Sequence, residues 1–415
     1  MPMLNVYLHG RKAGILSSDD GRLSFRYDPE YIAQTNPEPL SFSLPLCDEY
    51  YPEEAIVPFF SNLLPDEGVR VRIAEILGLS PENIFGLLQA IGEDCAGAVA
   101  LFTSDRTPAE QVKPIYRPLS NDEANDVLTH LAVRPLNIGA KDFRISGAGA
   151  QDKLVACVDK GQILLPLNGT PSTHIIKPGI ERFPESVFNE CFCMKLAKAC
   201  GLRVAECDIL EIQGIPYYVV ARYDREKVDG YWRRLHQEDF CQLLGVDPKV
   251  KYESEGGPGL PRCFDLMRRM ELSAADTIAF LDQIIFCFLI GNGDAHAKNF
   301  SVIYREGKPE LAPAYDLLST TVYPNLAARL AMKIEKEYNF RWITRGKFVR
   351  MGQKVGISEK VIDLELAKLS RKITVEATKL KEKLSKKYPA EVYDKIQRGI
   401  EARLAQLSVP FEPHG

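Results

Sequence analysis

The sequence predicts an α+β protein of two lobes, with a sheet-rich amino-terminal part and a helix-rich carboxy-terminal part. Up to about residue 225, short runs of alternating apolar and polar residues are separated by turn residues, which is typical of strands. Beyond that point apolar residues recur at helical spacing, most clearly over residues 358–408. A chain of 415 residues also exceeds the usual size of one hydrophobic core, so we expect more than one domain.

The composition is that of an ordinary soluble globular protein, with 45% hydrophobic and 26% charged residues. A formal net charge of −4 provides no overall electrostatic reason for binding nucleic acid. No apolar run is long enough to span a bilayer, and residues 1–10 lack the regions of a signal peptide, so we expect a cytoplasmic protein without a membrane partner. The ten cysteines form no CxxC pair, and we expect buried thiols in a reducing compartment.

The first expected domain covers residues 1–105. Residues 4–8, 12–16 and 23–27 alternate in the manner of strands and predict a small antiparallel sheet. Residues 58–77 look helical, and we expect the large apolar residues at their start to belong to the core, namely Phe59, Phe60, Leu63 and Leu64. The polar, proline-bearing stretch from residue 103 to residue 123 predicts a linker.

A second expected domain, residues 125–225, contains a stretch of small residues. Residues 143–158 predict a strand, a turn over residues 146–150 and a second strand. No bulky side chain obstructs the turn, so its backbone N–H groups can approach an anion closely. The stretch does not match the Walker A pattern and meets only the first part of G-x-G-x-x-G. On this pattern alone, a phosphate-binding lid and a tight β-hairpin both remain open.

Two charged residues of this domain have two interpretations each. The β-branched strand at residues 172–177 ends in Lys177, which is either an edge residue with a snorkelling charge or the lysine that holds nucleotide phosphates after a kinase lid. An amphipathic helix at residues 186–201 carries Glu190 near its start. There Glu190 either orients Lys177 or only interacts favourably with the helix dipole.

Two further strands, at residues 204–212 and 216–225, complete the sheet-rich part, and the second leads into Arg222, Asp224 and Arg225 at the expected hinge to the second lobe. The third expected domain covers residues 226–415. Its expected elements are helices over residues 235–245, 273–291 and 358–408, a glycine- and proline-rich loop at 251–259, and a core-facing stripe of Ile362, Leu366, Leu369 and Ile373.

The most informative stretch is residues 288–304, where an apolar helix ends in a Gly-Asn-Gly run and a polar loop follows. Asp294 and Asn299 stand five positions apart, the spacing of the protein-kinase catalytic loop, in which the Asp takes the substrate hydroxyl proton and the Asn holds magnesium. Asp316 follows where a kinase keeps its other magnesium-binding Asp. A helix C-cap and turn use the same residue types, so the loop alone also has a purely structural interpretation.

Five motifs in the same order make the chain resemble the HipA family, the toxin kinases of bacterial type II toxin–antitoxin modules. The resemblance extends from the opening strands to at least Ser319 and is less distinct beyond Tyr323. It implies a two-lobed, protein-kinase-like fold. The motifs are residues 146–153, 173–177, 251–259, 294–302 and 313–319.

The resemblance implies a Ser/Thr phosphotransferase that uses ATP and Mg²⁺. It assigns Asp294 as the catalytic base, Asn299 and Asp316 as metal ligands, and Ser146 as an autophosphorylation site that silences the kinase by expelling the loop. A phosphate there would put about two negative charges where the nucleotide phosphates must lie. The residues expected to contact the nucleotide are Ala148, Gly149, Ala150, Gln151, Asp152, Lys153, Lys177, Ala221, Arg222, Tyr223, His296, Ala297, Lys298, Asn299, Tyr315 and Asp316.

Two positions depart from the expected pattern. Gly147 stands where we expect a bulkier residue, which should make the loop more flexible. Ala221 stands where an acidic side chain is expected, which leaves adenine contacts to the backbone. No required catalytic part is missing, so we expect an active kinase.

The resemblance also implies partners. The expected substrate is a Ser or Thr of a translation factor, by default an aminoacyl-tRNA synthetase such as glutamyl-tRNA synthetase, with growth arrest and persistence as the outcome. A HipB-like helix-turn-helix antitoxin would hold the chain on operator DNA, so that DNA contact arrives mainly through the partner. Two alternatives remain open: the chain acts mainly as a corepressor with such an antitoxin, or it phosphorylates a small molecule.

Overall fold

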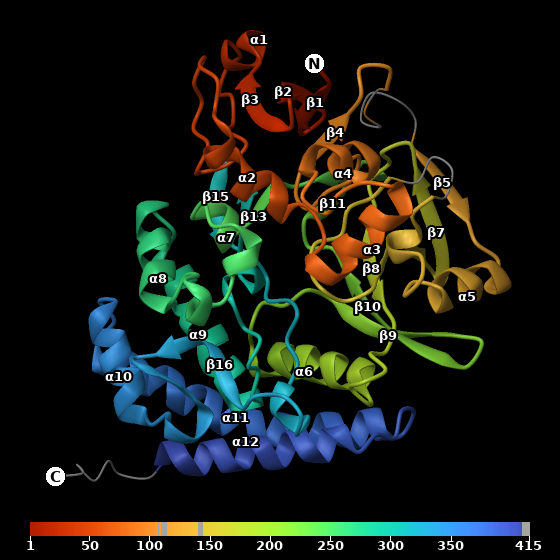
Figure 1. Cartoon of the computed structure of the whole chain (residues 1–415). Coiled ribbons are helices and arrows are strands. Elements are labelled where there is room, and N and C mark those ends of the chain that lie inside the picture. The colour runs from red at the N-terminus through yellow and green to blue at the C-terminus, as the bar shows by residue number, and fades with distance from the viewer. Residues whose placement is uncertain (107, 109–113, 140–143, 409–415) are drawn as a thin grey trace. The chain divides into compact units, whose positions relative to one another are not determined.

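The computed structural model describes residues 1–106, 108, 114–139 and 144–408 (Figure 1). The chain forms two compact units. Unit 1 consists of Met1–Pro178, Leu210–Lys249 and Ser301–Pro309. Unit 2 consists of Gly179–Ile209, Val250–Phe300 and Glu310–Gly415. Both units are therefore discontinuous in sequence.

The first sheet of unit 1 confirms the amino-terminal strands predicted from the sequence. Its strand order is β3-β2-β1-β4. Every second residue of β1, namely Leu4, Val6 and Leu8, is fully buried, as expected for a strand with one face on the core. The fourth strand, which pairs with β1, was not predicted. The bounds are β1 (Met3–Leu8), β2 (Arg11–Asp19), β3 (Arg22–Tyr27) and β4 (Val99–Phe102).

Four helices belong to the same region, and they bury the apolar residues predicted for the core. Phe59, Phe60, Leu63 and Leu64 are at most 2% exposed. The predicted helical stretch 58–77 is two helices, because the chain leaves the helical path at Pro65, which forms a β-bridge with Gly149. The bounds are α1 (Pro29–Ile32), α2 (Glu53–Asn62), α3 (Glu67–Leu77) and α4 (Ile84–Ile91).

A six-stranded sheet with the order β5-β7-β6-β8-β10-β9 contains or borders the unit 1 residues that were expected to contact the nucleotide. The three strands predicted between residues 172 and 225 are present as β8, β9 and β10. β8 lies between β6 and β10 and is antiparallel to both. The bounds are β5 (Ile115–Pro118), β6 (Leu154–Asp159), β7 (Gln162–Leu167), β8 (His174–Lys177), β9 (Cys207–Ile212) and β10 (Ile215–Ala221).

Two predictions for this region are wrong in part. The expected linker at 103–123 contains β5 and the start of helix α5 (Asn121–Thr129), while residues 107 and 109–113 of it lie outside the described residues. The strand expected before the small-residue turn is also not regular. Ile145 makes only a single β-bridge, to Asp94, and Phe143 lies outside the described residues.

The helix predicted at 235–245 is wrong for most of its length. Residues 237–239 form a strand that pairs with β14, and only one helical turn, α7 (Phe240–Leu243), follows. Pairing with a strand far along the chain therefore outweighs local helical spacing. The strands are β11 (Arg225–Val228) and β12 (Tyr231–Arg234) in one sheet, and β13 (Gln237–Asp239), β14 (Ser301–Arg305) and β15 (Lys308–Leu311) in another.

Unit 2 is mainly helical, as predicted for the carboxy-terminal part. The predicted stripe of Ile362, Leu366, Leu369 and Ile373 is buried, with at most 6% exposure. Helix α8 and the pair β16–β17 were not predicted. The bounds are α6 (Ser186–Cys200), α8 (Leu260–Arg269), α9 (Ala274–Ile290), α10 (Arg345–Lys354), α11 (Glu359–Ser385), α12 (Val392–Ser408), β16 (Arg329–Ile334) and β17 (Glu337–Asn339).

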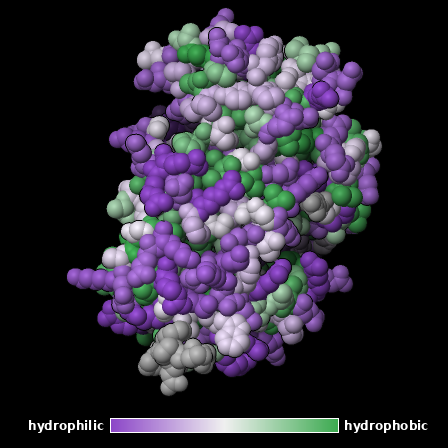
Figure 2. All heavy atoms as spheres, turned by 60° about the vertical axis from the view of Figure 1, so that its left-hand side comes forward, coloured by the Kyte–Doolittle hydropathy of each residue, from purple (hydrophilic) through white to green (hydrophobic). Residues whose placement is uncertain are grey.

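Hydrophilic residues cover most of the face shown in Figure 2, with hydrophobic residues scattered among them. Within the described ranges, none of the helices has both the length and the apolar character needed to cross a bilayer. All ten cysteines are free and eight of them are buried, in agreement with the prediction of buried thiols.

Candidate active site

The candidate catalytic loop begins where α9 ends. The last turns of α9 are apolar and buried, so the loop starts from a firmly packed helix. Gly291 ends the helix with a φ of 74°, a conformation that residues with a side chain rarely adopt. Asn292 is buried next to it, and its side-chain oxygen accepts a hydrogen bond from the Asp294 backbone N–H at 3.0 Å. The helix cap and turn are thus present, and they hold the backbone of Asp294.

The glycines of this run also allow a second segment to approach closely. The Thr320 hydroxyl accepts a hydrogen bond from the Gly293 N–H at 2.8 Å and donates one to the Gly291 carbonyl at 3.1 Å. A Cβ on Gly291 would overlap the Thr321 hydroxyl, and a Cβ on Gly293 would lie 2.5 Å from the Arg329 carbonyl oxygen. Because Thr320 follows Asp316 closely in the chain, these bonds fasten the loop of Asp294 to the segment that carries the second candidate carboxylate.

The side chain of Asp294 is accessible, although its loop is tightly held. It is 42% exposed, and its Oδ1 accepts a hydrogen bond from the Tyr252 hydroxyl at 2.5 Å. The buried His296 has its Nε2 4.0 Å from the same oxygen. The Asn299 side-chain N–H donates to the Asp294 carbonyl at 2.9 Å, which closes the loop on itself. An accessible carboxylate on a rigid backbone is what a general base requires.

The second candidate carboxylate has an unusual backbone. Asp316 adopts a φ of 56°, in the left-handed region that few residues other than glycine occupy, and such strain is concentrated at functional sites. The hydroxyl of the preceding Tyr315 donates to the Lys298 carbonyl at 2.7 Å. This bond ties the Asp316 segment to the short 3₁₀ helix Ala297–Asn299. The side-chain N–H of Asn299 is used within the loop, which leaves its oxygen as the atom available to a cation.

Two residues that the sequence analysis did not single out stabilise this region. Asn189 of α6 is fully buried and exchanges two hydrogen bonds with the backbone of Ser319, at 2.9 and 2.8 Å. Arg403 of α12 donates from Nε to the Leu289 carbonyl in the last turn of α9, at 2.8 Å. Burial lowers the pKa of Arg403 to about 10. Both residues come from helices remote in sequence, and no local pattern marks them.

In unit 1 the glycine-rich segment is anchored to residues that lie earlier in the chain, between Leu63 and Asp94. Ser146 is 2% exposed, and its hydroxyl donates to the Leu63 carbonyl at 2.5 Å while its N–H donates to the Asp94 carbonyl at 3.1 Å. Farther along, the Gly149 carbonyl accepts a hydrogen bond from the Asp66 N–H at 3.2 Å. The segment is therefore held at both ends by residues that precede it by more than 50 positions.

Contacts within the segment explain its small residues. A Cβ added to Gly147 would lie 3.0 Å from the Val155 side chain. This crowded packing accounts for a glycine where we expected a bulkier residue. Gly149 has a φ of 103°, which also favours glycine. The ammonium group of Lys153 donates to the Ala148 carbonyl, and the Gln151 amide donates to the Pro178 carbonyl at 2.9 Å. Asp152 is ion-paired with Arg72.

Lys177 is not an edge residue. It ends β8, an interior strand of the sheet, and is only 8% exposed, with its Nζ 5.6 Å from the ring centroid of Tyr218. The interpretation as a snorkelling edge lysine is therefore wrong. Glu190, its candidate partner, is 5% exposed on α6.

The residues of the expected hinge, 221–223, already make hydrogen bonds within the fold. Ala221 pairs with His174 in the β10–β8 ladder. The Arg222 N–H donates to the Thr173 carbonyl at 2.8 Å, and the Tyr223 hydroxyl donates to Gln237 at 2.6 Å. An adenine contact from the Arg222 N–H would compete with the sheet bond.

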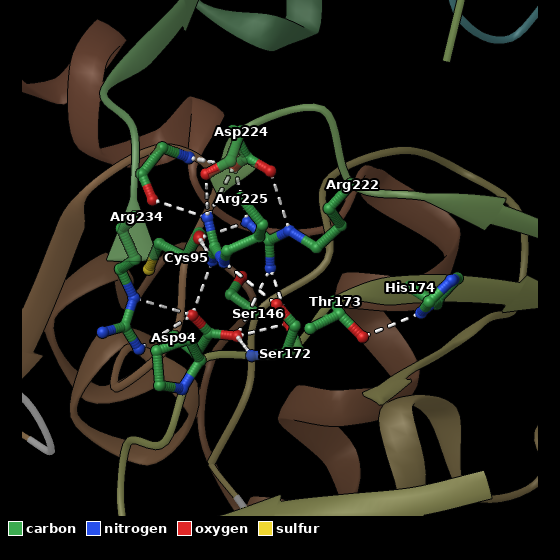
Figure 3. Close-up of polar contacts among 12 residues, drawn as sticks. Asp94, Cys95, Ser146, Ser172, Thr173, His174, Arg222, Asp224, Arg225 and Arg234 are labelled. Carbon is green, nitrogen blue, oxygen red and sulfur yellow. Dashed lines mark hydrogen bonds and ion pairs between the residues drawn. The ribbon is translucent and has the colours of Figure 1, made fainter. Parts of the chain in front are cut away.

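The side chain of Arg222 belongs to a buried ion network centred on Asp94 (Figure 3). Arg225 and Arg234 donate to Oδ1 of Asp94 at 2.7 and 3.0 Å. Arg222 and the Ser172 hydroxyl donate to its Oδ2 at 3.3 and 2.5 Å. Burial opposes the ionisation of Asp94, but the three arginines outweigh burial and hold its pKa well below its usual range.

A second carboxylate completes this network. Asp224 forms ion pairs with Arg222 at 2.7 Å and Arg225 at 3.0 Å and accepts a hydrogen bond from the Gly97 N–H at 2.6 Å. Burial opposes its ionisation too, and the two arginines lower its pKa in spite of it. The network joins residues 94–97 to residues 222–234 within unit 1 and carries three positive charges against two negative ones.

The predicted site residues divide between the two units. Asp294, Asn299, Lys298 and Tyr315 are connected by hydrogen bonds within unit 2. The full set in unit 2 is Asp294, His296, Ala297, Lys298, Asn299, Tyr315 and Asp316; the set in unit 1 is Ser146, Ala148, Gly149, Ala150, Gln151, Asp152, Lys153, Lys177, Ala221, Arg222 and Tyr223.

Comparison with known proteins identifies the family. Residues 145–377 match the model of the HipA-like C-terminal domain, and residues 4–102 match that of the HipA N-terminal domain. The protein Y4mE of Sinorhizobium fredii is 45% identical over 80% of this chain and 81% of its own length. The serine/threonine-protein kinase toxin HipA of Shewanella oneidensis is 30% identical over 89% of this chain and 87% of its own.

A solved structure agrees with the sequence relatives. The HipA chain in a complex of Shewanella oneidensis HipA, HipB and operator DNA superimposes with a TM-score of 0.85 at 27% identity, covering 97% of both chains. This similarity confirms the predicted α+β, kinase-like fold. The chain belongs to the HipA family.

Proposed function

We propose that this chain is a serine/threonine protein kinase with toxin activity that uses ATP and Mg²⁺. The observation that carries the proposal is the accessible carboxylate of Asp294, on a loop fastened to the segment of Asp316. The name of the Shewanella relative supports it. In this proposal residues 1–105 form a separate subdomain, residues 125–225 bind the nucleotide and residues 226–415 carry the catalytic groups.

The residues of unit 2 fit a magnesium ion. Mg²⁺ takes oxygen ligands from one or two side chains and fills its other positions with phosphate oxygens and water. The side-chain oxygen of Asn299 and the carboxylate of Asp316 would hold it. Magnesium, when bound, neutralises charge on the phosphate oxygens. Asp294 would accept the proton of the substrate hydroxyl, which is the role of the corresponding Asp in protein kinases.

The residues of unit 1 fit the nucleotide. Lys177 would hold its phosphates, together with the backbone of residues 148–153. The backbone of Ala221 and Tyr223 would face adenine, since the Arg222 N–H is already bonded within the sheet. In unit 2, we propose His296, Ala297 and Lys298 as further nucleotide contacts.

We also assign Ser146 as the site of a silencing autophosphorylation. Its buried hydroxyl is bonded to the Leu63 carbonyl, so the loop has to leave this place before the hydroxyl can be phosphorylated. A phosphate with about two negative charges could not return to the Leu63 carbonyl oxygen, which is itself negatively polarised. The modified loop would therefore stay displaced from the nucleotide phosphates.

The proposed protein substrate is a translation factor, with an aminoacyl-tRNA synthetase such as glutamyl-tRNA synthetase as the first to test, and the proposed outcome is growth arrest. The proposed inhibitor is a HipB-like antitoxin. A second candidate function is that of a corepressor bound to such an antitoxin. It is favoured by the structural relative, which was solved with HipB and operator DNA.

Phosphate transfer into a bacterial extract tests the proposal. The purified chain and its Asp294→Asn variant are incubated with γ-³²P-labelled ATP, Mg²⁺ and extract. We expect one labelled extract protein with the wild type and none with the variant. A labelled metabolite without a labelled protein would support a small-molecule kinase, and no transfer by either protein would leave the corepressor role.

A further inference from the structure

The glycine- and proline-rich segment at residues 251–259 has a tightly packed backbone. The Glu255 and Gly257 N–H groups both donate to the Tyr252 carbonyl, at 3.0 and 2.9 Å. A Cβ on Gly257 would overlap the Val250 carbonyl oxygen, and a Cβ on Gly259 would lie 2.6 Å from the Glu253 carboxylate. The glycines therefore let the segment fold back tightly around Tyr252 and Glu253.

Glu253 fixes this folded segment to β16. Its Oε2 accepts a hydrogen bond from the Lys333 N–H at 2.6 Å, and its Oε1 lies 3.7 Å from the Lys333 ammonium group. The Lys333 ammonium group also lies over the ring of Tyr338. These contacts set the position of Tyr252, which precedes Glu253 directly.

Tyr252 is directed at the candidate base. Its hydroxyl donates to Oδ1 of Asp294 at 2.5 Å, and its ring packs edge-on against the ring of His296, with 5.0 Å between the centroids. Across the described part of the chain, the other oxygen of Asp294, Oδ2, has no hydrogen bond. One carboxylate oxygen is therefore held by the protein, and the other is left for a second hydroxyl group.

We propose that Tyr252 is a positioning residue for phosphoryl transfer: it fixes the rotation of the Asp294 carboxylate through Oδ1 and leaves Oδ2 to receive the substrate proton. This role rests on the proposed function. In that step the substrate oxygen forms the new P–O bond, the bond from the γ-phosphorus to the β,γ-bridging oxygen of ATP breaks, and the hydroxyl proton ends on Oδ2. The products are the phosphoester, ADP and a protonated Asp294.

A different role for the same contact predicts the opposite outcome. If the Tyr252 hydroxyl only occupied the place of the substrate hydroxyl, its removal would open the site and raise the rate. If Tyr252 positions the base, its removal lets the carboxylate rotate away from the productive geometry, and the rate falls. Small errors in the placement of a reacting group cost large factors in rate.

The test is steady-state kinetics of the full chain with γ-³²P-labelled ATP and Mg²⁺, in which released phosphate and label on the chain are counted. For Tyr252→Phe we expect kcat to fall about 10- to 100-fold, with the KM for ATP unchanged, since the substitution keeps the ring and removes only the hydroxyl that donates to Asp294. Tyr231→Phe is the matched control, because Tyr231 is 65% exposed in the β11–β12 hairpin. It should behave as the wild type.

Hydrogen exchange over residues 250–259 reports on the hydrogen bond between Tyr252 and Asp294 independently of the rate of phosphate transfer. Asp294→Asn keeps a side-chain oxygen that accepts from Tyr252, so this segment should stay as protected as in the wild type while transfer is lost. Tyr252→Phe should increase exchange in the segment.

An unchanged or increased kcat for Tyr252→Phe, beside an inactive Asp294→Asn, would refute the role of Tyr252 and leave the proposed function standing. An active Asp294→Asn variant or an inactive wild type would refute both.

Discussion

Asp94 and Asp294 are both carboxylates in polar surroundings, but they differ in exposure and in the number of hydrogen-bond donors around them. Asp94 is fully buried, and three arginines and a serine surround it. Asp294 is 42% exposed, and among the described residues the Tyr252 hydroxyl is the only hydrogen-bond donor to its carboxylate. A carboxylate whose two oxygens both accept several hydrogen bonds can only hold other groups in place. A carboxylate with one oxygen free of hydrogen bonds can accept a proton.

A large number of polar contacts around a carboxylate therefore does not identify it as a group that can accept a proton. Although burial opposes its ionisation, three arginines hold the pKa of Asp94 well below its usual range, and every charge in its network has a partner of opposite sign, as in a structural ion network. In the loop around Asp294, Asn292 and Thr320 hold the backbone by hydrogen bonds, while the carboxylate stays accessible.

The largest expected effect on stability comes from breaking the network. Asp94→Asn should lower the free energy of unfolding by about 3–5 kcal/mol, because it leaves three buried arginines with one carboxylate. Urea unfolding measures the loss. Asp19→Asn, at an exposed end of β2, is the control and should change stability by less than about 0.5 kcal/mol. Similar losses for the two variants would mean that the network does not stabilise the fold.

Glu238 is a buried carboxyl group bonded to the Phe42 N–H and the Tyr304 hydroxyl, and burial raises its pKa to about 7 from 4.5. The folded chain thus binds this proton more tightly than the unfolded chain, so its contribution is most favourable below pH 4.5 and is lost as pH rises toward 7. The loss amounts to about 3 kcal/mol. Glu238→Gln should remove this pH dependence from unfolding curves measured between pH 4.5 and 8. An unchanged slope would show that Glu238 stays ionised.

Gly293→Ala should lower the rate of phosphate transfer more than it lowers the stability of the fold. Its Cβ would lie 2.5 Å from the Arg329 carbonyl oxygen and 2.9 Å from the Thr320 hydroxyl, so the loop of Asp294 has to shift. We expect Gly293→Ala to lower the rate of phosphate transfer by about 100-fold. Gly68→Ala, where nothing lies within 4 Å of the added Cβ, is the matched control. Equal rates for the two variants would exclude a role for the loop position.

The smallest effect is expected for an exposed ion cluster with similar chemistry. Arg345 forms ion pairs with Glu359 at 2.5 Å and Asp363 at 2.6 Å, but its side chain is 45% exposed. Solvent screens such pairs, so Arg345→Ala should cost less than about 1 kcal/mol in urea unfolding. A cost as large as that of Asp94→Asn would show that burial is not what distinguishes the network.

The sequence predicted where α9 ends and the polar loop of Asp294 and Asn299 begins, because these residues are contiguous and their spacing has chemical meaning. The network around Asp94 could not be predicted, since Asp94 and Arg234 are separated by 140 positions and meet only in the folded chain. The strand at 237–239 was missed for the same reason, because its partner β14 lies far along the chain. The loop 251–259 was recognised as irregular, but its contact to Asp294 required the structure.

The most direct test is the rate of γ-phosphoryl transfer by the purified Asp294→Asn variant. The rate is compared with that of the wild type under conditions in which the urea unfolding curves of the two proteins coincide. Removal of a general base costs about 10²- to 10⁴-fold in rate. We predict a loss in this range with unchanged stability, in contrast to the loss of stability expected for Asp94→Asn. Transfer at more than about a tenth of the wild-type rate would contradict the assignment of Asp294 as the base.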